Sequence, residues 1–97
     1  MRLIGDEILS EFARENPKAA KSAQAWKRCM EAGSFRHFAD LKKAISSADY
    51  VKPYTVFNIS KNKYRLIAQV AYLAQKVRVV AVLTHAEYDK AKWKEAS

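Results

Sequence analysis

The chain has 97 residues, of which 49% are hydrophobic, and its 18 lysines and arginines against 10 aspartates and glutamates give a formal net charge of +8 at pH 7. This length predicts a single domain over residues 1–97 with a modest core, and the apolar content excludes an intrinsically disordered chain. The excess of positive charge favours a polyanionic partner: RNA, DNA, an acidic membrane surface or an acidic protein.

The single cysteine, Cys29, excludes an internal disulfide. It falls within a helical pattern, and we interpret it as a buried structural thiol rather than a nucleophile. The two histidines, His37 and His85, are far apart and lack cysteine company, so no metal ion or other cofactor is predicted. We find no signal-peptide pattern and no stretch near the ~18 apolar residues of a membrane span. We therefore expect a cytoplasmic protein that does not contact a membrane.

Residues 1–4 are too few to assign alone and could form an edge strand. A helical period begins at Gly5, because Ile8 and Phe12 lie four residues apart. The stretch "ENPK" ends this helix and starts the next, with Asn16 as the predicted N-cap and Pro17 in the first turn. We expect the two helices to form an antiparallel pair.

The second helix is predicted to stop at Gly33, and Ser34 is a candidate cap for a third, short helix. Apolar residues recur at helical spacing in both. The expected buried stripes are Ala19, Ala23, Trp26 and Met30 in the second helix, and Phe35, Phe38, Leu41 and Ile45 in the third.

The chain changes character after Tyr54. Pro53 excludes a central strand position just before it, and three segments rich in β-branched and aromatic residues follow it, over 54–59, 64–73 and 76–84. The intervening residues 60–63 and 74–75 are predicted turns, and residues 85–97 form a short helix or a frayed tail. The predicted fold class is α+β, with N-terminal helices packed on a small antiparallel β-sheet.

Strand pairing places one arginine among polar residues. A four-residue loop over 60–63 pairs Asn58 with Arg65 and Phe57 with Leu66, so that the two apolar residues face the helices. A second turn centred on residues 74 and 75 places Arg65 opposite Thr84. We therefore predict a row of Asn58, Arg65 and Thr84 on the other face, an arrangement that a one-residue register shift would destroy. The alternative is a solvated arginine on an open sheet face.

The stretch "THAEYDK" combines groups that carry protons. His85 is a candidate proton shuttle near neutral pH, and Tyr88 can donate or accept a hydrogen bond. An alternative interpretation is a helix start, in which Thr84 is the N-cap and Glu87 completes a capping box. The two interpretations are compatible.

Two lysines lie in the first predicted turn. Lys61 and Lys63 are candidate phosphate contacts from their position, and the alternative is that they are solvated turn residues.

Three stretches of the sequence carry a resemblance that covers nearly the whole chain. "FNISKNKYRLIAQVAY" followed by "THAEYDKAK", behind "FADLKKAISSADYV", closely resembles the HigB family of bacterial toxins, within the RelE-like group of toxin–antitoxin systems. The resemblance implies a RelE-like fold and a toxin that cleaves messenger RNA, usually on the ribosome. It also implies a HigA-like antitoxin with a helix-turn-helix domain, and operator DNA as a partner only of the toxin–antitoxin complex.

The resemblance also implies site residues. Cleavage would use the RNA's own 2′-hydroxyl, and Arg65 matches the strand arginine that would stabilise the phosphate. His85 is the candidate base or acid, and Tyr88 is a second proton donor or a base-stacking residue. RelE has lysines on the preceding strand, where this chain has Val56 and Asn58, which leaves the general base open. The expected RNA contacts are Asn58, Lys61, Lys63 and Thr84. Trp93, in the charged tail, could pack on an antitoxin, an RNA base or the sheet.

Two other functions fit the same features. A basic module could bind RNA or DNA without cutting it, or an inactive toxin homologue could act only through its antitoxin. The charge of the chain could also serve only an acidic protein partner.

Overall fold

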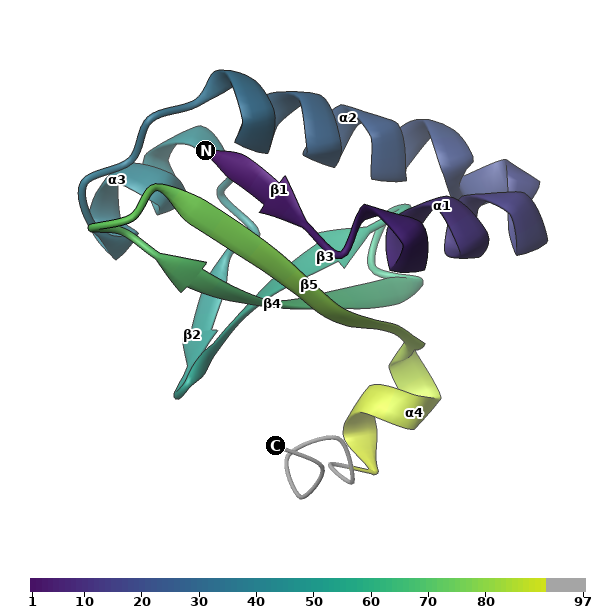
Figure 1. The fold of residues 1–97 in the computed structure, drawn as a ribbon. Coiled ribbons are helices and arrows are strands. Elements are labelled where there is room, and N and C mark those ends of the chain that lie inside the picture. Colours follow the sequence, from purple (N-terminus) through teal and green to yellow (C-terminus); the bar gives the residue numbers. More distant parts are fainter. Residues whose placement is uncertain (91–97) are drawn as a thin grey trace.

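A computed structural model describes residues 1–90, and Figure 1 shows its two faces: helices lie above a twisted sheet and one short helix lies below it. The sheet has five strands in the order β1-β5-β4-β3-β2. The elements in chain order are β1 (Arg2–Ile4), α1 (Asp6–Glu15), the 3-10 helix η1 (Pro17–Ala19), α2 (Ala20–Ala32), α3 (Phe38–Ala44), β2 (Asp49–Val51), β3 (Tyr54–Ile59), β4 (Tyr64–Ala71), β5 (Lys76–Thr84) and α4 (His85–Asp89).

The predicted α+β class is confirmed, with two differences at the edges of the sheet. β1 pairs with β5 in parallel, so the sheet is mixed and not wholly antiparallel. β2 is an additional antiparallel edge strand beside β3, joined to it by a turn that contains a cis Lys52–Pro53 bond. The possible edge strand within residues 1–4 is confirmed as β1, whereas β2, with three residues, is too short for a period of two to reveal it in the sequence.

α1 and α2 cover one face of the sheet, which we call the α1/α2 face (Figure 1). Most of the apolar residues predicted to point inward are buried, although Phe38 and Ile45 of the third helix are buried only in part, and aromatic pairs join the layers. The rings of Trp26 and Phe57 meet edge-on with centroids 5.4 Å apart, and those of Phe12 and Tyr64 at 4.9 Å. Burial of these large side chains supplies the main driving force for packing the helices on the sheet.

One predicted helix cap has the predicted position and the other is wrong. Asn16 is the N-cap residue of η1 and Pro17 follows in its first turn, but the Asn16 side chain makes no capping hydrogen bond; its amide Nδ2 instead donates to the carbonyl of Phe12 at 3.0 Å and closes the end of α1. Ser34 does not begin α3, which starts four residues later with His37 as the N-cap, whose Nδ1 accepts from the amide of Asp40 at 3.4 Å. The linker between α2 and α3 stays outside the helix because the turn between β4 and β5 holds its backbone at Phe35.

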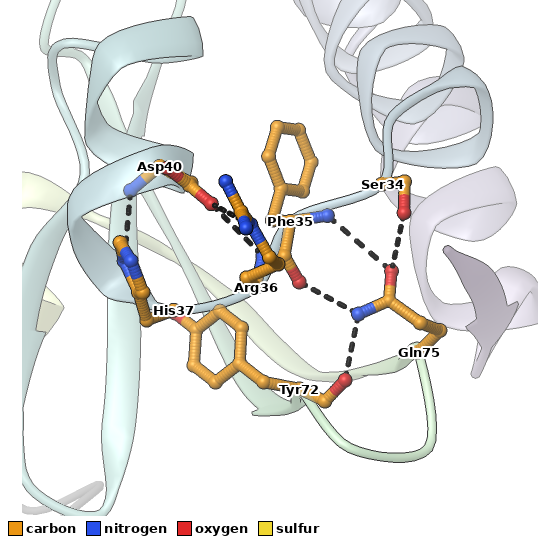
Figure 2. A network of polar contacts seen from close by, with 7 residues as sticks. All are labelled: Ser34, Phe35, Arg36, His37, Asp40, Tyr72 and Gln75. Atoms are coloured by element: carbon orange, nitrogen blue, oxygen red, sulfur yellow. Dashed lines mark hydrogen bonds and ion pairs between the residues drawn. The ribbon is translucent and has the colours of Figure 1, made fainter.

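Gln75 makes that connection, as Figure 2 shows. Its backbone is left-handed, with φ of 54°, at the turn between β4 and β5. Its Nε2 donates to the carbonyls of Phe35 and Tyr72, at 2.6 Å each, and its Oε1 accepts from the amide of Phe35 at 3.3 Å. One side chain therefore joins the α2–α3 linker to the tip of the β4–β5 hairpin.

We expect Gln75→Ala to lower the free energy of unfolding by about 1–3 kcal/mol, because it removes several hydrogen bonds and leaves partly buried main-chain groups unpaired. Urea unfolding followed by circular dichroism measures the difference. Gln24→Ala, an exposed substitution on α2, is the matched control and should shift the midpoint little. Equal midpoints for the two variants would contradict this role of Gln75.

The other face of the sheet bears α4, and we call it the α4 face (Figure 1). A second small apolar cluster lies there, formed by Tyr54, Val56 and Ile67 with Leu83 and Tyr88 packed against them. Trp93 and the rest of the tail lie outside the described residues. Among the helices within residues 1–90, none has the length and apolar character to cross a membrane.

Candidate functional site

The first hairpin has the predicted register. Ile59 pairs with Tyr64, Asn58 with Arg65, and Phe57 with Leu66. Phe57 and Leu66 are fully buried on the α1/α2 face. Asn58 and Arg65 therefore lie side by side on the α4 face, near the turn between β3 and β4.

The register predicted for the second hairpin is wrong. Arg65 pairs with Leu83, and Thr84 pairs with Tyr64. There are two reasons: the turn spans residues 72–75, and a β-bulge leaves Val80 without a partner, since Ala68 pairs with Val79 and Ile67 with Ala81. Thr84 consequently lies on the α1/α2 face, away from Arg65. It lines a groove there together with Glu11, Glu15 and Glu87, an acidic setting that does not suit RNA.

Arg65 is held at the end of β4 by main-chain carbonyls and an aromatic ring. Its Nη1 donates to the carbonyl of Asn62 at 2.9 Å and to that of Tyr64 at 3.3 Å. Its guanidinium carbon lies 5.8 Å from the centroid of the Tyr88 ring, a cation–π distance. These contacts occupy one terminal nitrogen, so Nε and Nη2 have no hydrogen-bond acceptor within residues 1–90.

The turn that receives Arg65 has an unusual backbone. Ser60, Lys61 and Asn62 are all left-handed, with φ of 56°, 53° and 71°. The left-handed conformation costs about 1–2 kcal/mol for residues such as Ser60 and Lys61, while asparagine tolerates it better, and strain of this kind gathers at functional sites. The side chains of Lys61 and Lys63 are exposed, and neither has a carboxylate within 4.0 Å in the described part of the chain. The turn therefore presents two uncompensated cations.

The predicted capping box at the start of α4 is confirmed. Thr84 Oγ1 accepts from the amide of Glu87 at 3.2 Å, and Glu87 Oε1 accepts from the amide of Thr84 at 2.9 Å. The amide of His85 donates to the carbonyl of Lys63 at 3.2 Å, which joins α4 to the β3–β4 turn. His85 Nδ1 lies 2.9 Å from Asp89 Oδ2, so the carboxylate orients the exposed imidazole. His85, Tyr88, Arg65 and the turn lysines thus belong to one end of the sheet.

Burial is the main cause that raises the pKa of Tyr88, followed by the negative charge of Asp49, while Arg65 opposes the shift. The phenol is therefore neutral at physiological pH and can donate a proton. Asp49 belongs to this face, since it lies on β2 and pairs there with Val56 of β3. Sequence reasoning missed it because it missed the strand.

We expect the free energy of unfolding to fall as the pH rises above about 10, the usual tyrosine value. Burial raises the pKa of both Tyr88 and Tyr72 in the folded state. The stability that the protonated tyrosines contribute is therefore complete below the pKa of the unfolded state. It disappears as the pH rises through the higher pKa of the folded state. Urea titrations at several alkaline pH values measure the slope, which should be shallower in Tyr88→Phe. In the exposed control Tyr50→Phe the slope should change much less, because Tyr50 is the weakest of the groups that act on the pKa of Tyr72. An unchanged slope in Tyr88→Phe would contradict the burial effect.

One of the two β3 positions at which RelE has lysines is buried in this chain. Val56 is 3% exposed and belongs to the apolar cluster beneath α4. Asn58, two residues on, is exposed beside Arg65 and its amide donates to Ser47 Oγ at 3.4 Å. Within residues 1–90 there is no cluster of three or more metal-ligating side chains.

Helices on one face of a small, mostly antiparallel sheet agree with the α+β fold of the RelE-like toxins of toxin–antitoxin systems. Comparison with known proteins specifies the class further. The family model described as HigB_toxin, RelE-like toxic component of a toxin-antitoxin system, matches residues 19–91, and the chain belongs to this family.

Curated relatives agree with the assignment. The chain is 32% identical over 92 residues to the mRNA interferase toxin HigB of Escherichia coli strain K12, covering 92% of this chain and 88% of the relative. The proteins named mRNA interferase HigB in Escherichia coli O157:H7 and Shigella flexneri match with the same identity and coverage. Membership of the family implies an antitoxin as partner.

Proposed function

We propose that this chain is an endoribonuclease that cleaves messenger RNA on the ribosome and thereby arrests translation and growth. The names of its relatives support an mRNA substrate. The observation that carries the proposal is the environment of Arg65. Its guanidinium is held in place at an accessible end of the sheet, and within residues 1–90 no acceptor occupies Nε and Nη2, so both can bind an anion. A phosphate oxygen pair matches that fork.

The proposed reaction needs no cofactor. A base takes the proton of a ribose 2′-hydroxyl, the oxygen attacks the adjacent phosphorus, and the bond from phosphorus to the 5′-oxygen breaks. The 5′-oxygen takes a proton, which leaves a 2′,3′-cyclic phosphate and a 5′-hydroxyl. Arg65 stabilises the charge that accumulates on the phosphate, and Asn58 orients it.

Two groups are proposed to move the protons. His85 is the base, because Asp89 holds Nδ1 and leaves Nε2 to accept a proton. Tyr88 is the acid, because burial keeps its phenol neutral and Arg65 lies against its ring. Lys61 and Lys63 hold the RNA backbone from the turn. Thr84 is not included among the RNA contacts, because it faces α1 and caps α4.

The ribosome is proposed to position the message. With Val56 buried where a lysine would be needed, the site depends more on placement of the 2′-hydroxyl than on a strong base, and placement alone can supply a large part of a rate enhancement. The proposed setting is the cytoplasm. The proposed antitoxin is a HigA-like helix-turn-helix protein, and the complex of the two would bind operator DNA.

Two experiments test the proposal. Expression of the chain alone should arrest growth, and co-expression of the neighbouring gene's product should relieve the arrest. Purified protein added to translating ribosomes should produce codon-linked cuts with 2′,3′-cyclic phosphate ends, while the same message without ribosomes stays intact. Binding to ribosomes without cuts would instead favour a non-catalytic homologue, for which the apolar Val56 is the supporting observation.

A further inference from the structure

We propose that Arg2, Lys76 and Arg78 form a second RNA-binding surface, which holds backbone phosphates of RNA beyond the scissile site. The inference rests on the proposed function, since it extends the substrate path away from Arg65. We call these three residues the β1/β5 cation group. None of them is among the site residues derived above.

Strand register places the group on the α4 face. Gln69 lies on the same face of β4 as Arg65, and it pairs with Arg78. Lys76 is two residues before Arg78 and so shares its face, and it pairs in turn with Arg2 on β1. Val77 and Val79, the alternate residues of β5, are buried on the α1/α2 face. The three cations are thus neighbours on adjoining strands.

The group is exposed and its charge is not compensated. None of the three has a carboxylate within 4.0 Å in the described part of the chain, whereas Lys27 and Arg36 are paired with Asp6 and Asp40. The strands β1, β3, β4 and β5 contain no aspartate or glutamate at all. Four acidic residues lie on α1, on the other side of the sheet, while Asp49 on β2 and Asp89 on α4 lie away from the group, at the far edge of the α4 face and at its Arg65 end. The β1/β5 side of the α4 face therefore has a positive potential that attracts a polyanion.

The spacing suits an extended strand of RNA. Four residues of β4 separate Arg65 from Gln69, which at ~3.4 Å per residue is about 14 Å. Arg78 is therefore too far away to contact the phosphate that Arg65 binds, and it meets a phosphate further along the same chain. Lys76 continues the path by two residues, about 7 Å. α4 covers only the Arg65 end of this face, where Tyr88 packs.

The salt dependence of RNA binding tests the group. The substrate is a single-stranded 2′-O-methyl oligoribonucleotide, which binds but lacks the attacking hydroxyl. Each phosphate contact to a single strand contributes about 0.7 to the slope of log K against log salt. The variant Lys76→Ala/Arg78→Ala should therefore reduce the slope by about 1.4 relative to the unsubstituted chain.

The matched control removes the same charge elsewhere. Lys21→Ala/Arg28→Ala takes two exposed cations from α2, on the opposite layer, and should change the slope by less than about half as much. Thermal unfolding of both variants checks that the fold is retained. Binding to isolated small ribosomal subunits is measured in parallel, since the phosphates could belong to message or ribosomal RNA.

A reduced slope with the oligonucleotide assigns the group to the message strand, and a reduced slope only with the subunits assigns it to ribosomal RNA. Equal slopes for the variant and the unsubstituted chain on both targets would overturn the proposal. The cleavage assay gives a separate outcome. If the chain cut no message but the double variant still had a smaller salt slope, the proposed nuclease activity would be refuted and the proposed RNA-binding surface would stand.

Discussion

Replacing Arg65 by alanine is expected to reduce ribosome-dependent message cleavage by about 10²–10³-fold, the usual cost of removing one preorganised group that stabilises a developing negative charge. Arg65 is the one side chain of the site that is both permanently charged and oriented by main-chain carbonyls and the Tyr88 ring. Cleavage is measured as the rate at which new message ends appear in a reconstituted translation system with excess protein.

Two controls separate this effect from loss of charge or of fold. Arg65→Lys keeps the charge but loses the planar fork, so it should retain more activity than alanine and less than arginine. Arg28→Ala removes an exposed arginine from α2 and should leave the rate unchanged. Because Arg65 also donates to the carbonyls of Asn62 in the turn and Tyr64 in β4, its loss should cost about 1 kcal/mol of stability, which unfolding measurements would show. Full activity of a folded Arg65→Ala variant would remove this residue from the mechanism.

The sequence supports prediction of the first hairpin but not of the second. The turn over 60–63 is bounded by strongly patterned strands, so its length follows directly and the Asn58–Arg65 pair with it. The second turn spans residues 72–75 and not only the predicted residues 74–75. Tyr72 and Leu73 have the composition of strand residues, but β4 ends before them. The shifted turn moves the register by two residues, and the bulge at Val80 moves it back by one, which brings Thr84 to the other face; no local residue type signals the bulge. Thr84 was placed beside Arg65 for these two reasons.

Long-range contacts explain the other differences. Gln75 bonds with Phe35, forty residues away, and no local pattern reveals that an extended linker would replace an early start of α3. Asp49 was missed because β2 has three residues and depends on pairing with β3. By contrast, the capping box at Thr84 and Glu87 depends on residues three apart, and it was predictable from them. Prediction succeeded where the partners are close in sequence, as in the capping box and the Asn58–Arg65 pair, and failed where the deciding contact is distant in sequence.

The capping box and the candidate chemistry share one short helix. Thr84 and Glu87 fix the start of α4, and His85 binds the β3–β4 turn through its amide. Tyr88 is thereby placed over Arg65, and Asp89 beside His85. In "THAEYD", Thr84 and Glu87 thus have the structural role, and His85 and Tyr88 have the proposed chemical role. This division explains why the short motif contains so many polar groups.

Tyr88→Phe is expected to slow cleavage by about 10²-fold or more, the lower range for loss of a general acid. The substitution keeps the ring that packs on Arg65 and on the Val56–Ile67 cluster, so it removes the phenolic proton with little change in packing. If the phenol protonates the leaving 5′-oxygen, a message with sulfur in place of that oxygen should be cut at similar rates by both proteins, since a thiolate leaves without a proton.

The same pair of substrates assigns His85. If this residue is the base, His85→Ala should be slow on both the oxygen and the sulfur substrate, because the 2′-hydroxyl must still lose its proton. The two substitutions therefore give opposite patterns if the roles are as proposed. Equal slowing of Tyr88→Phe on both substrates would mean that the hydroxyl positions the RNA and does not donate the proton. Rescue of His85→Ala by the sulfur substrate would exchange the two roles, because the imidazole would then be the group that protonates the leaving oxygen.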